Sequence, residues 1–479
     1  MRETSIRKLF DRSPDVVIRP VAFGEGRSAE TILLIFCTTL CDIERIDEIV
    51  LPRLYRAASA GGGRQLVKTI PQLLSAVPME FNEEYLVEEV FGGTLILFHE
   101  QTGALFTLGM SKRPNRNVEE TNTEVSVRGP RDGFIEDLNT NIALIRKRLR
   151  TPTLTYEQFV IGRRSKTQVA LLYMTDITRD DVIAEVRDRI KQVDVDLLPS
   201  IESLGKTVAT SSYRFFPAFI FTGRPDFAAD ALVNGRFLIL MDGDPTCMIA
   251  PVELLYLLKT AEDNRLASVY VMAERMIRLV GLFFALFMPA FWTALVVYHQ
   301  DQLPYRMLAT VTMARQGVPF PAGFESFIML FLFELFREAG ARMPKAVGQT
   351  LSVVGGLIIG DAAIRAGLAS PGQVVVIAMS FVATSTLVHH SLTGTASLLR
   401  MFFLLVSTLL GMYGVVLSFI GLILCWTNIE YFGVHYLASI NYSNFRQLFA
   451  ATLFLPYHEL RKRAKFLRLK DETSGGDEG

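Results

Sequence analysis

Apolar residues are distributed unevenly along this chain. Before about residue 266 they occur in short runs separated by charged residues, and after it they occur in long runs. The stretches 279–298, 366–399 and 401–429 contain no Asp, Glu, Lys or Arg. A helix that rises about 1.5 Å per residue needs about 20 residues to cross a hydrocarbon core of about 30 Å. The pattern therefore predicts a soluble N-terminal region followed by an α-helical transmembrane bundle.

The soluble region contains two copies of one pattern. Residues 30–54 form an apolar run, a turn and an amphipathic helix, and residues 167–190 repeat this order. Residues 88–109 have the pattern of a helix end followed by strand, turn and strand, and residues 229–251 repeat that order. We therefore predict an α/β region of two similar subdomains. A helix over 132–149, with basic residues in its last turn, is expected to join them.

These patterns also set the expected domain boundaries. The N-terminus has no apolar signal segment, and the tail HELRKRAKFLRLK is strongly basic, so both are expected on the cytoplasmic side. The predicted parts are a first cytoplasmic subdomain at 1–130, a linker helix at 131–151, a second cytoplasmic subdomain at 152–265, a helical membrane domain at 266–456, and a basic then acidic tail at 457–479.

Composition supports a membrane protein and offers little catalytic chemistry. Hydrophobic residues make up 50% of the chain, and the mean hydropathy is +0.30. There is no Gly-x-Ser-x-Gly motif, and the glycine run at 61–64 lacks the Lys-Ser/Thr of a phosphate-binding loop. We interpret Asp242-Gly243-Asp244 as a hairpin turn rather than a metal loop. We accordingly predict no enzyme activity, no cofactor and no metal site.

Two further groups of residues have structural interpretations. The four cysteines, none at zinc-binding spacing, are expected to be scattered buried thiols in a reducing compartment; they are Cys37, Cys41, Cys247 and Cys425. A cluster of basic residues lacks the interleaved aromatics of a nucleic-acid site, so it predicts a solvated helix face or a docking surface for a subunit or anionic lipid. Its members are Arg128, Arg131, Arg146, Lys147, Arg148 and Arg150.

The first two helices of the membrane region carry charge or proline. A helix over 276–298 has Arg275 and Arg278 as inner anchors and Pro289 in its middle. Pro289 is consistent with a bent anchor or a gating hinge, and neighbouring groups must satisfy the carbonyl that it frees. The segment 323–336, about 14 residues, is too short to span comfortably.

That short segment carries the carboxylates of Glu325 and Glu334, and a third, that of Glu338, follows it closely. Glu325 is expected to cap its beginning, and Glu334 and Glu338 share a face one turn apart. Two interpretations remain open for it. It is either an interfacial or re-entrant helix, or an element whose acids lie near an ion path.

A helix over 347–367 is made largely of small residues. Gly356 and Gly360 form a Gly-x-x-x-Gly pair, which favours close helix packing. A narrow uncharged stripe on the same helix is also suited to line a pore; it contains Gln349, Ser352, Val353, Gly356, Ile359, Gly360 and Ala363. Asp361 and Arg365, four residues apart, are expected to pair. Spans over 373–388 and 401–427 follow, and the total number of spans stays open.

Three ordered motifs resemble one known family. They are RGPRDGFIEDLNTNIALIRKRLR within 125–154, RPDFAADALVNGRFLILMDGDP within 221–251, and VPFPAGFESFIMLFLFELFREAGARMP with GQTLSVVGGLIIGDAA within 315–372. Together they resemble the A-subunit family of bacterial spore germinant receptors (GerA-type). The chain departs from that family after Phe432, where FGVHYLASINYSNFRQLF stands in place of a Pro-rich loop.

The resemblance implies a function that the residues alone do not establish. It implies a multi-pass protein of the spore inner membrane whose N-terminal domain is on the cytoplasmic (core) side. Its expected partners are a transporter-like, ligand-binding B subunit and a lipoprotein C subunit. It implies nutrient sensing, homo-oligomerisation and a ligand-gated channel for monovalent cations, with no nucleic-acid partner. The alternatives are a secondary transporter of a small nutrient or ion and a non-conducting scaffold for the other subunits.

Overall fold

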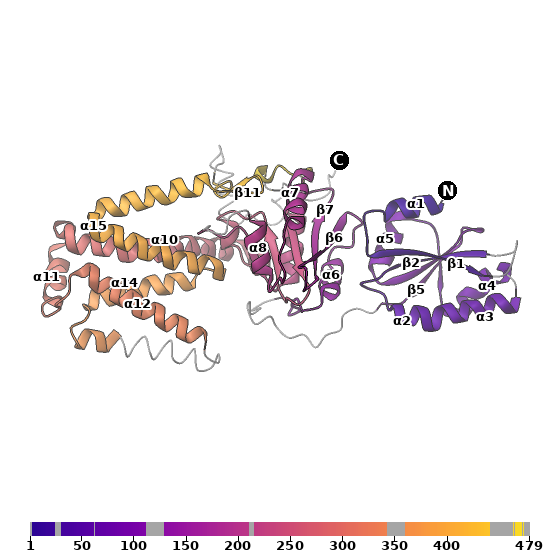
Figure 1. The fold of residues 1–479 in the computed structure, drawn as a ribbon, viewed down its shortest axis with the longest axis horizontal. Coiled ribbons are helices and arrows are strands. Elements are labelled where there is room, and N and C mark those ends of the chain that lie inside the picture. Colours follow the sequence, from indigo (N-terminus) through magenta and orange to yellow (C-terminus); the bar gives the residue numbers. More distant parts are fainter. Residues whose placement is uncertain are drawn as a thin grey trace. The chain divides into compact units, whose positions relative to one another are not determined.

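The computed structural model describes residues 2–23, 30–61, 63–111, 129–209, 215–342, 360–440, 463, 465–471 and 473. The chain divides into two compact units (Figure 1). The first unit comprises Met1–Ser212, Phe219–Pro251 and His458–Gly479. The helical unit comprises Tyr213–Ala218 and Val252–Tyr457.

The first unit begins with a five-stranded antiparallel sheet. Its order is β1-β2-β4-β5-β3. Its strands are β1 (Val16–Phe23), β2 (Glu30–Cys37), β3 (Val77–Met79), β4 (Thr94–His99) and β5 (Leu105–Gly109). Helices cover both faces, because β2 and β4 are apolar on both sides. One core includes residues of η2 and of α3 and α4, and the other includes residues of α1 and α5. The helices are α1 (Arg2–Leu9), the short α2 (Ile43–Arg45), η2 (Ile46–Val50), α3 (Leu51–Gly61), α4 (Gly63–Leu74) and α5 (Glu83–Phe91).

A second antiparallel sheet follows in the same unit, with the order β6-β7-β9-β10-β8. Its strands are β6 (Leu154–Ile161), β7 (Thr167–Met174), β8 (Ile220–Thr222), β9 (Phe237–Met241) and β10 (Cys247–Ala250). Its helices are α7 (Asp180–Lys191), α8 (Ile201–Val208) and α9 (Pro225–Val233).

The two sheets have the same topology. In each sheet the first, second, fourth, fifth and third strands in sequence order lie side by side in that order. The strand–helix units at β2 and β7, and the hairpins β4–β5 and β9–β10, occupy equivalent positions. The predicted α/β region of two similar subdomains, followed by a helical bundle, is therefore confirmed.

Asp242, Gly243 and Asp244 form the hairpin turn between β9 and β10, as the Asp-Gly sequence predicts. Gly243 has a φ of 85°, which favours glycine at this position. Asp242 Oδ1 accepts a hydrogen bond from the backbone N–H of Leu138 at 3.3 Å, and Asp244 Oδ2 accepts one from that of Ile201 at 3.1 Å. Both carboxylates thus fix the starts of neighbouring helices.

The helix that joins the subdomains is shorter than the predicted 132–149. It is α6 (Leu138–Arg146), because Asp137 caps its N-terminus by accepting from the backbone N–H of Thr140 at 2.7 Å. Asp132 lies outside the helix, where both its carboxylate oxygens accept from Arg148 at 2.7 Å.

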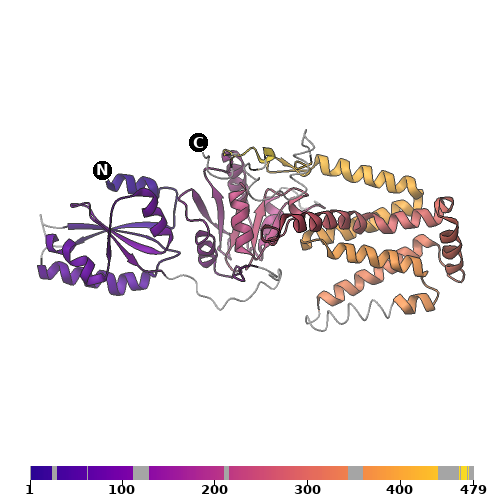
Figure 2. The same cartoon turned by 180° about the vertical axis from the view of Figure 1, so that it is seen from behind.

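The helical unit contains α10, α11, α12, a helical segment at 360–365, α14 and α15 (Figure 2). Their bounds are Ser268–Tyr298 for α10, Tyr305–Ala314 for α11, Ala322–Ala341 for α12, Pro371–Ser385 for α14 and His390–Asn428 for α15. Short 3-10 helices occur at Tyr256–Leu258, Asp263–Arg265, Gln300–Gln302 and Lys465–Leu467. A small hairpin, β11 (Glu430–Tyr431) with β12 (Val434–His435), follows α15.

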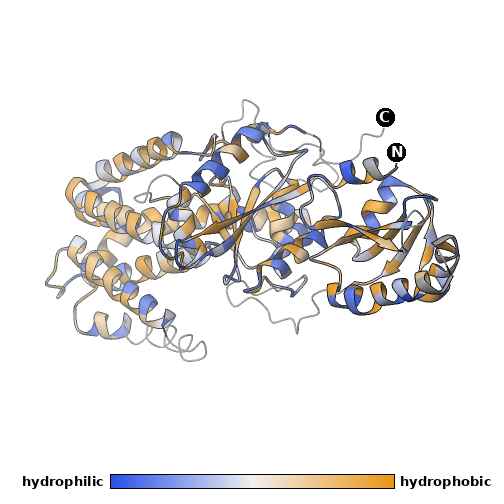
Figure 3. Cartoon of the chain, turned by 45° about the vertical axis from the view of Figure 1, so that its right-hand side comes forward, coloured by the Kyte–Doolittle hydropathy of each residue, from blue (hydrophilic) through white to orange (hydrophobic). Residues whose placement is uncertain are grey.

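Among the described residues of this unit, two helices are long and apolar enough to cross a membrane. They are Ser268–Tyr298 and Ser391–Asn428. In Figure 3 apolar residues cover most of the long helices of the helical unit, whereas helices of the first unit alternate between polar and apolar. α10 packs mainly against α14 and α15.

Four predicted helix bounds in this unit are wrong. The span predicted at 373–388 is α14, which begins at Pro371 and ends at Ser385. The helix predicted at 276–298 begins at Ser268. The short helix predicted at 323–336 is the 20-residue α12, because the charges at its end pair within the helix, Glu334 with Arg337 and Glu338 with Arg342, instead of ending it. The last predicted span, 401–427, is part of α15, which begins at His390 and is interrupted at Gly411.

Candidate functional site

One charged residue stands alone in the longest uncharged part of the chain. Between Arg365 and Glu430, Arg400 is the single Asp, Glu, Lys or Arg. It lies in α15, and its side chain is fully buried. A buried guanidinium in an apolar bundle is unfavourable unless it is paired and hydrogen-bonded, so its partners decide what it does.

Arg400 joins three helices. Its Nη2 donates to Glu334 Oε1 of α12 at 2.7 Å. Its Nη1 donates to the hydroxyls of Ser380 and Thr384 of α14, at 3.1 and 3.0 Å. The guanidinium also lies over the ring of Phe381, 4.4 Å from the centroid. These contacts fix α12, α14 and α15 in one arrangement.

The same contacts reach α10 through Pro289. Proline has no N–H, so the carbonyl of Ala285, one turn earlier, loses its helical partner. The Ser380 hydroxyl donates to that carbonyl oxygen at 3.1 Å. The predicted need for a neighbour to satisfy the freed carbonyl is therefore met, and by a side chain that Arg400 also contacts.

A second arginine completes what we call the Arg400 network. Arg337 contacts Glu334 at 2.6 Å and donates to the Ser397 hydroxyl at 2.8 Å. The Ser397 hydroxyl also accepts from Arg400 Nη2 at 3.3 Å. The network consists of Arg400, Glu334, Arg337, Ser380, Thr384 and Ser397. It holds two guanidinium groups and one carboxylate, so its formal charge is positive.

Glu325 serves a different helix from the one predicted. No side chain caps the start of α12. Instead, Glu325 Oε1 accepts from the backbone N–H and the hydroxyl of Ser370, both at 2.6 Å, at the N-terminus of α14. A carboxylate is favourable there because the first N–H groups of a helix lack partners and carry partial positive charge. Glu325 is fully buried, and Arg315 lies 3.9 Å from its Oε2.

Each of the three glutamates among the predicted intramembrane charges has a guanidinium within salt-bridge distance. Glu325 is close to Arg315, Glu334 pairs with Arg400 and Arg337, and Glu338 pairs with Arg342 at 2.6 Å. In this arrangement their negative field is largely compensated.

The predicted pair of Asp361 and Arg365 forms, with 2.8 Å between Asp361 Oδ2 and Arg365 Nε. Both side chains are more than half exposed within the chain. The pair thus lies on the surface of the helical unit, at the end of the small-residue segment.

Most of the predicted pore stripe lies outside the described residues, namely Gln349, Ser352, Val353, Gly356 and Ile359. Gly360 and Ala363 are described, and both are buried. Ala363 packs in a cluster with Met329, Leu330 and Ile377. At this end the small residues therefore permit close helix packing, and the pore-lining assignment of the stripe stays a prediction.

In the first unit the expected basic surface is partly buried. Arg146 and Asp15 form a bidentate ion pair with both distances 2.9 Å, and neither side chain is exposed. The Arg146 guanidinium also lies over Phe91, 4.5 Å from its centroid. Arg146 and Arg148 are therefore not free surface cations, because Asp15 and Asp132 bind them.

The thiols follow the prediction in part. Cys37, Cys41 and Cys247 are buried, but Cys425 is exposed because it lies on an outward face of α15. Burial, with a smaller contribution from the negative charge of Asp15, raises the pKa of the Cys37 thiol to about 12. Burial alone raises the pKa of Cys41 to about 12. Neither thiol is activated.

Ionic contacts also fix the entry into α10. The Asp263 carboxylate is fully buried. It accepts hydrogen bonds from Arg275 Nε and Arg278 Nη1, both at 3.0 Å, and from the Thr260 hydroxyl at 2.5 Å. Burial acts to raise the pKa of Asp263, but the Thr260 hydroxyl and the two guanidinium groups outweigh it and the pKa is lowered. The predicted inner anchors Arg275 and Arg278 thus bind a carboxylate of the same chain.

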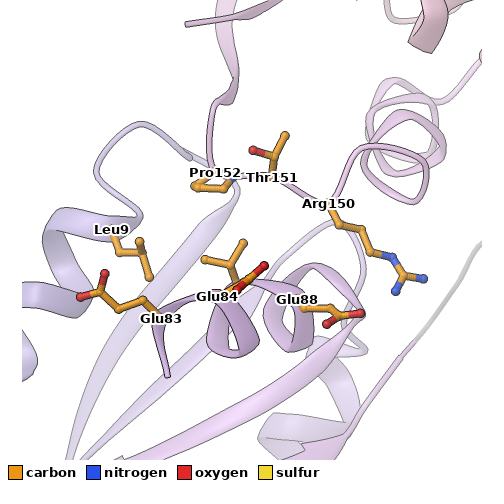
Figure 4. Close-up of a pocket in the computed structure, with 8 residues that line it drawn as sticks. Leu9, Glu83, Glu84, Glu88, Arg150, Thr151 and Pro152 are labelled. Atoms are coloured by element: carbon orange, nitrogen blue, oxygen red, sulfur yellow. The ribbon is translucent and has the colours of Figure 1, made fainter. Parts of the chain in front are cut away.

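An open groove of about 450 Å³ lies in the first unit (Figure 4). Three carboxylates from α5, those of Glu83, Glu84 and Glu88, line it together with the segment Arg150, Thr151 and Pro152. The acidic side chains and Arg150 make it polar, and Arg150 is the one lining residue that belongs to the predicted basic cluster.

Arg400 was missing from the predicted site, although the sequence carries its signal. A lone arginine between two uncharged runs of membrane-spanning length is itself a functional indication. Ser380 and Thr384, four residues apart on the preceding helix, could have been read as its hydrogen-bonding partners.

Comparison with known proteins identifies the family. The model for the Bacillus/Clostridium GerA spore germination protein family matches residues 4–466. The chain belongs to this family. It is 38% identical over 476 residues to spore germination protein XA of Bacillus anthracis, covering 99% of this chain and 97% of that relative. It is 33% identical over 470 residues to spore germination protein GerLA of Bacillus cereus, covering 98% and 95%.

One solved structure is also similar. It is the crystal structure of the N-terminal domain of the A subunit of the Bacillus megaterium spore germinant receptor GerK3. The identity is 24% and the TM-score 0.40, and the match covers 53% of this chain and 94% of that chain. The family model and the two relatives confirm the resemblance to the GerA-type family across nearly the whole sequence.

Proposed function

We propose that this chain is the A subunit of a nutrient-sensing spore germinant receptor. The observation that carries the proposal is the GerA family match over residues 4–466, supported by relatives named spore germination proteins along nearly their whole length. In this proposal the chain acts in the spore inner membrane, as a multi-pass protein with its N-terminal region on the cytoplasmic side. It works with a ligand-binding B subunit and a lipoprotein C subunit, and it is not an enzyme.

The proposed parts keep the boundaries expected from the sequence. Residues 1–130 and 152–265 are the cytoplasmic subdomains, 131–151 join them, 266–456 form the membrane domain and 457–479 form the tail. The identical strand orders of the two sheets support the first of these divisions, and the two long apolar helices support the membrane domain.

The finer proposal is that several copies of this chain form a channel for monovalent cations. The small-residue segment 347–367 lines the path, and Val353 or Ile359 forms an apolar constriction that closes it by dewetting. The Arg400 network supports this proposal because paired charges inside an apolar bundle are unfavourable to bury and are characteristic of functional membrane proteins. The network holds α12 and α14, the helices before and after this segment, and the Glu325 contact joins the same two helices.

In this channel the paired carboxylates have a defined part. Glu325, Glu334 and Glu338 are compensated by arginines in the described arrangement, and that arrangement is the closed state. Opening separates at least one of these pairs, and the released carboxylate then attracts cations to the path.

Ion flux from liposomes tests the proposal. The purified full chain is reconstituted alone and with its B and C subunits, and efflux of K⁺ and of Cl⁻ is measured with and without nutrients. We expect nutrient-dependent K⁺ efflux with all subunits and little Cl⁻ efflux. Val353→Ala should raise nutrient-independent K⁺ efflux, and Leu357→Ala, which lies outside the predicted stripe, should not.

Two outcomes would contradict the channel. Absence of flux under every condition, with assembly of the three subunits intact, would identify the chain as a scaffold. Saturable uptake of a nutrient coupled to an ion gradient would instead identify a secondary transporter.

A further inference from the structure

The helix α15 is broken at one residue. Gly411 has φ 61° and ψ −141°, a backbone conformation available only to glycine, inside an otherwise helical segment. The segment therefore consists of two arms, a first arm at 390–410 and a second arm at 412–428. Figures 1 and 2 both show these arms running in different directions from their junction.

Tyr298, the last residue of α10, occupies the break. Its hydroxyl donates to the carbonyl oxygen of Thr408 at 2.8 Å, one of the carbonyls that lose their partners where the first arm ends. Its ring is so close that a Cβ on Gly411 would be 2.9 Å from it. The tyrosine thus stabilises this bent geometry of α15, and the glycine is required for two independent reasons.

The first arm is fixed by polar contacts to its neighbours. It carries Arg400, and the Ser407 hydroxyl donates to the carbonyl oxygen of Ala290 in α10 at 2.6 Å. α12 also approaches so closely that any side chain on Gly323 would overlap Thr408.

The second arm is held differently. Among the described residues, no side-chain hydrogen bond joins 412–428 to another helix. Its buried positions form one narrow stripe, which contains Gly414, Val415, Ser418 and Leu422. Phe419 adds ring contacts with Phe287 and Phe283 of α10, at centroid distances of 5.8 and 6.3 Å. Such apolar contacts are non-directional, so they permit small rotations that hydrogen bonds would resist.

The far end of the second arm contacts a segment that leads into the second sheet. Trp426 packs edge-on against Phe216 at 5.9 Å between ring centroids. Tyr431 of β11 donates from its hydroxyl to the carbonyl oxygen of Phe216 at 2.8 Å, and Tyr436 packs on the same ring. Residues 215–218 continue along the chain into β8, an edge strand of the second sheet.

We propose that the second arm and the hairpin β11–β12 form a lever that pivots at Gly411, with Tyr298 as the latch that sets its resting position. The lever couples the chain entering β8 to the membrane bundle. Displacement of residues 216–218 moves the far end of the arm. The first arm stays in place because the Arg400 network holds it and because the Thr395 hydroxyl of this arm donates to the carbonyl oxygen of Phe215 at 2.5 Å. This inference concerns the conformation of the chain and does not depend on whether the receptor conducts ions.

The chain carries a natural probe position on the lever. Cys425 is exposed on the second arm, and the other three cysteines are buried. Leu398, exposed on the first arm, is replaced by cysteine to supply the second position. Spin labels on both are measured by double electron–electron resonance in the full chain in nanodiscs, diluted with unlabelled Cys425→Ser chain to remove distances between copies.

We expect one narrow distance distribution in the parent and a distribution at least twice as wide in Tyr298→Phe, which loses only the hydroxyl of the latch. Phe216→Ala should also broaden it, because the far end is released. Gly421→Ala is the matched control: it lies on the same arm with open space around it, so its distribution should not change.

Three results would overturn the lever. An unchanged width in Tyr298→Phe would mean that the break is rigid. An unchanged width in Phe216→Ala would remove the coupling at the far end. Equal broadening in Gly421→Ala would show that the arm responds to any substitution. Gly411→Ala serves as a second test, because a correctly folded variant with the parental distance would show that glycine is not required.

Discussion

Arg400 in α15 and Glu334 in α12 form an ion pair of 2.7 Å in which the guanidinium is fully buried. The pair joins helices separated in the sequence by the predicted pore segment, and the Nη1 of Arg400 donates to two hydroxyls of α14. A pair of this kind contributes less to stability than to the choice of one arrangement, because removing charges from water is unfavourable. We interpret it as the contact that sets the resting arrangement of the bundle.

The two partners should not be equivalent. Glu334→Gln leaves the Arg400 guanidinium buried without a carboxylate, so we expect a loss of about 3–5 kcal/mol in the free energy of unfolding. Arg400→Met should be milder, because Glu334 is partly exposed and keeps Arg337. Denaturant titration of the full chain in micelles measures both. Glu338→Gln, at the exposed pair with Arg342, is the control and should leave the midpoint unchanged; equal effects at Glu334 and Glu338 would contradict this role of the network.

The pair of Asp15 and Arg146 should fix α6 against the first subdomain. Asp15→Asn leaves a fully buried guanidinium without its carboxylate, and we expect a destabilisation of about 3–5 kcal/mol. Hydrogen exchange should show it as faster exchange in β2 and α6. Asp194→Asn removes an exposed partner of Arg163 and should change neither element. Unchanged protection in Asp15→Asn would mean that the buried pair does not hold these elements together.

Thiol chemistry should separate one cysteine from the others. In detergent, a maleimide at neutral pH should label Cys425 and leave Cys37, Cys41 and Cys247 unlabelled until the chain unfolds.

Burial raises the pKa of the Cys37 thiol from its ordinary value of 9.0 to about 12 in the folded chain. Stability from the neutral buried thiol is therefore complete below pH 9.0 and is lost as the pH rises toward 12. Mass spectrometry after labelling checks this, and rapid labelling of Cys37 in the folded chain near pH 9 would contradict it.

The two-lobed soluble region could be predicted from the sequence because its pattern is local. A strand followed by an amphipathic helix, and a hairpin with an Asp-Gly turn, each occur twice at similar spacing. The Asp361–Arg365 pair was equally local, because its members are four positions apart in the sequence. These features need only the periodicity of helices and strands.

The remaining features depend on contacts between distant parts of the chain. Glu325 has the position of a cap for its own helix, yet it binds Ser370, 45 residues away. Arg146 belongs to a run of basic residues, but it is buried in an ion pair with Asp15, which lies 131 residues earlier. Gly411 is one of several glycines in an apolar helix, and only the position of Tyr298 distinguishes it. Local pattern does not contain this information.

Cysteine accessibility along the segment 347–367 shows whether this segment lines a cation path. In a Cys425→Ser background, Ser352→Cys, Gly356→Cys and Leu357→Cys are made singly, and the full receptor is reconstituted in liposomes. A water-soluble methanethiosulfonate reagent is then added during nutrient-activated K⁺ efflux. We expect efflux to be blocked in Ser352→Cys and Gly356→Cys and to continue in Leu357→Cys. Block confined to Leu357→Cys, or equal effects at all three positions, would contradict a cation path along this stripe.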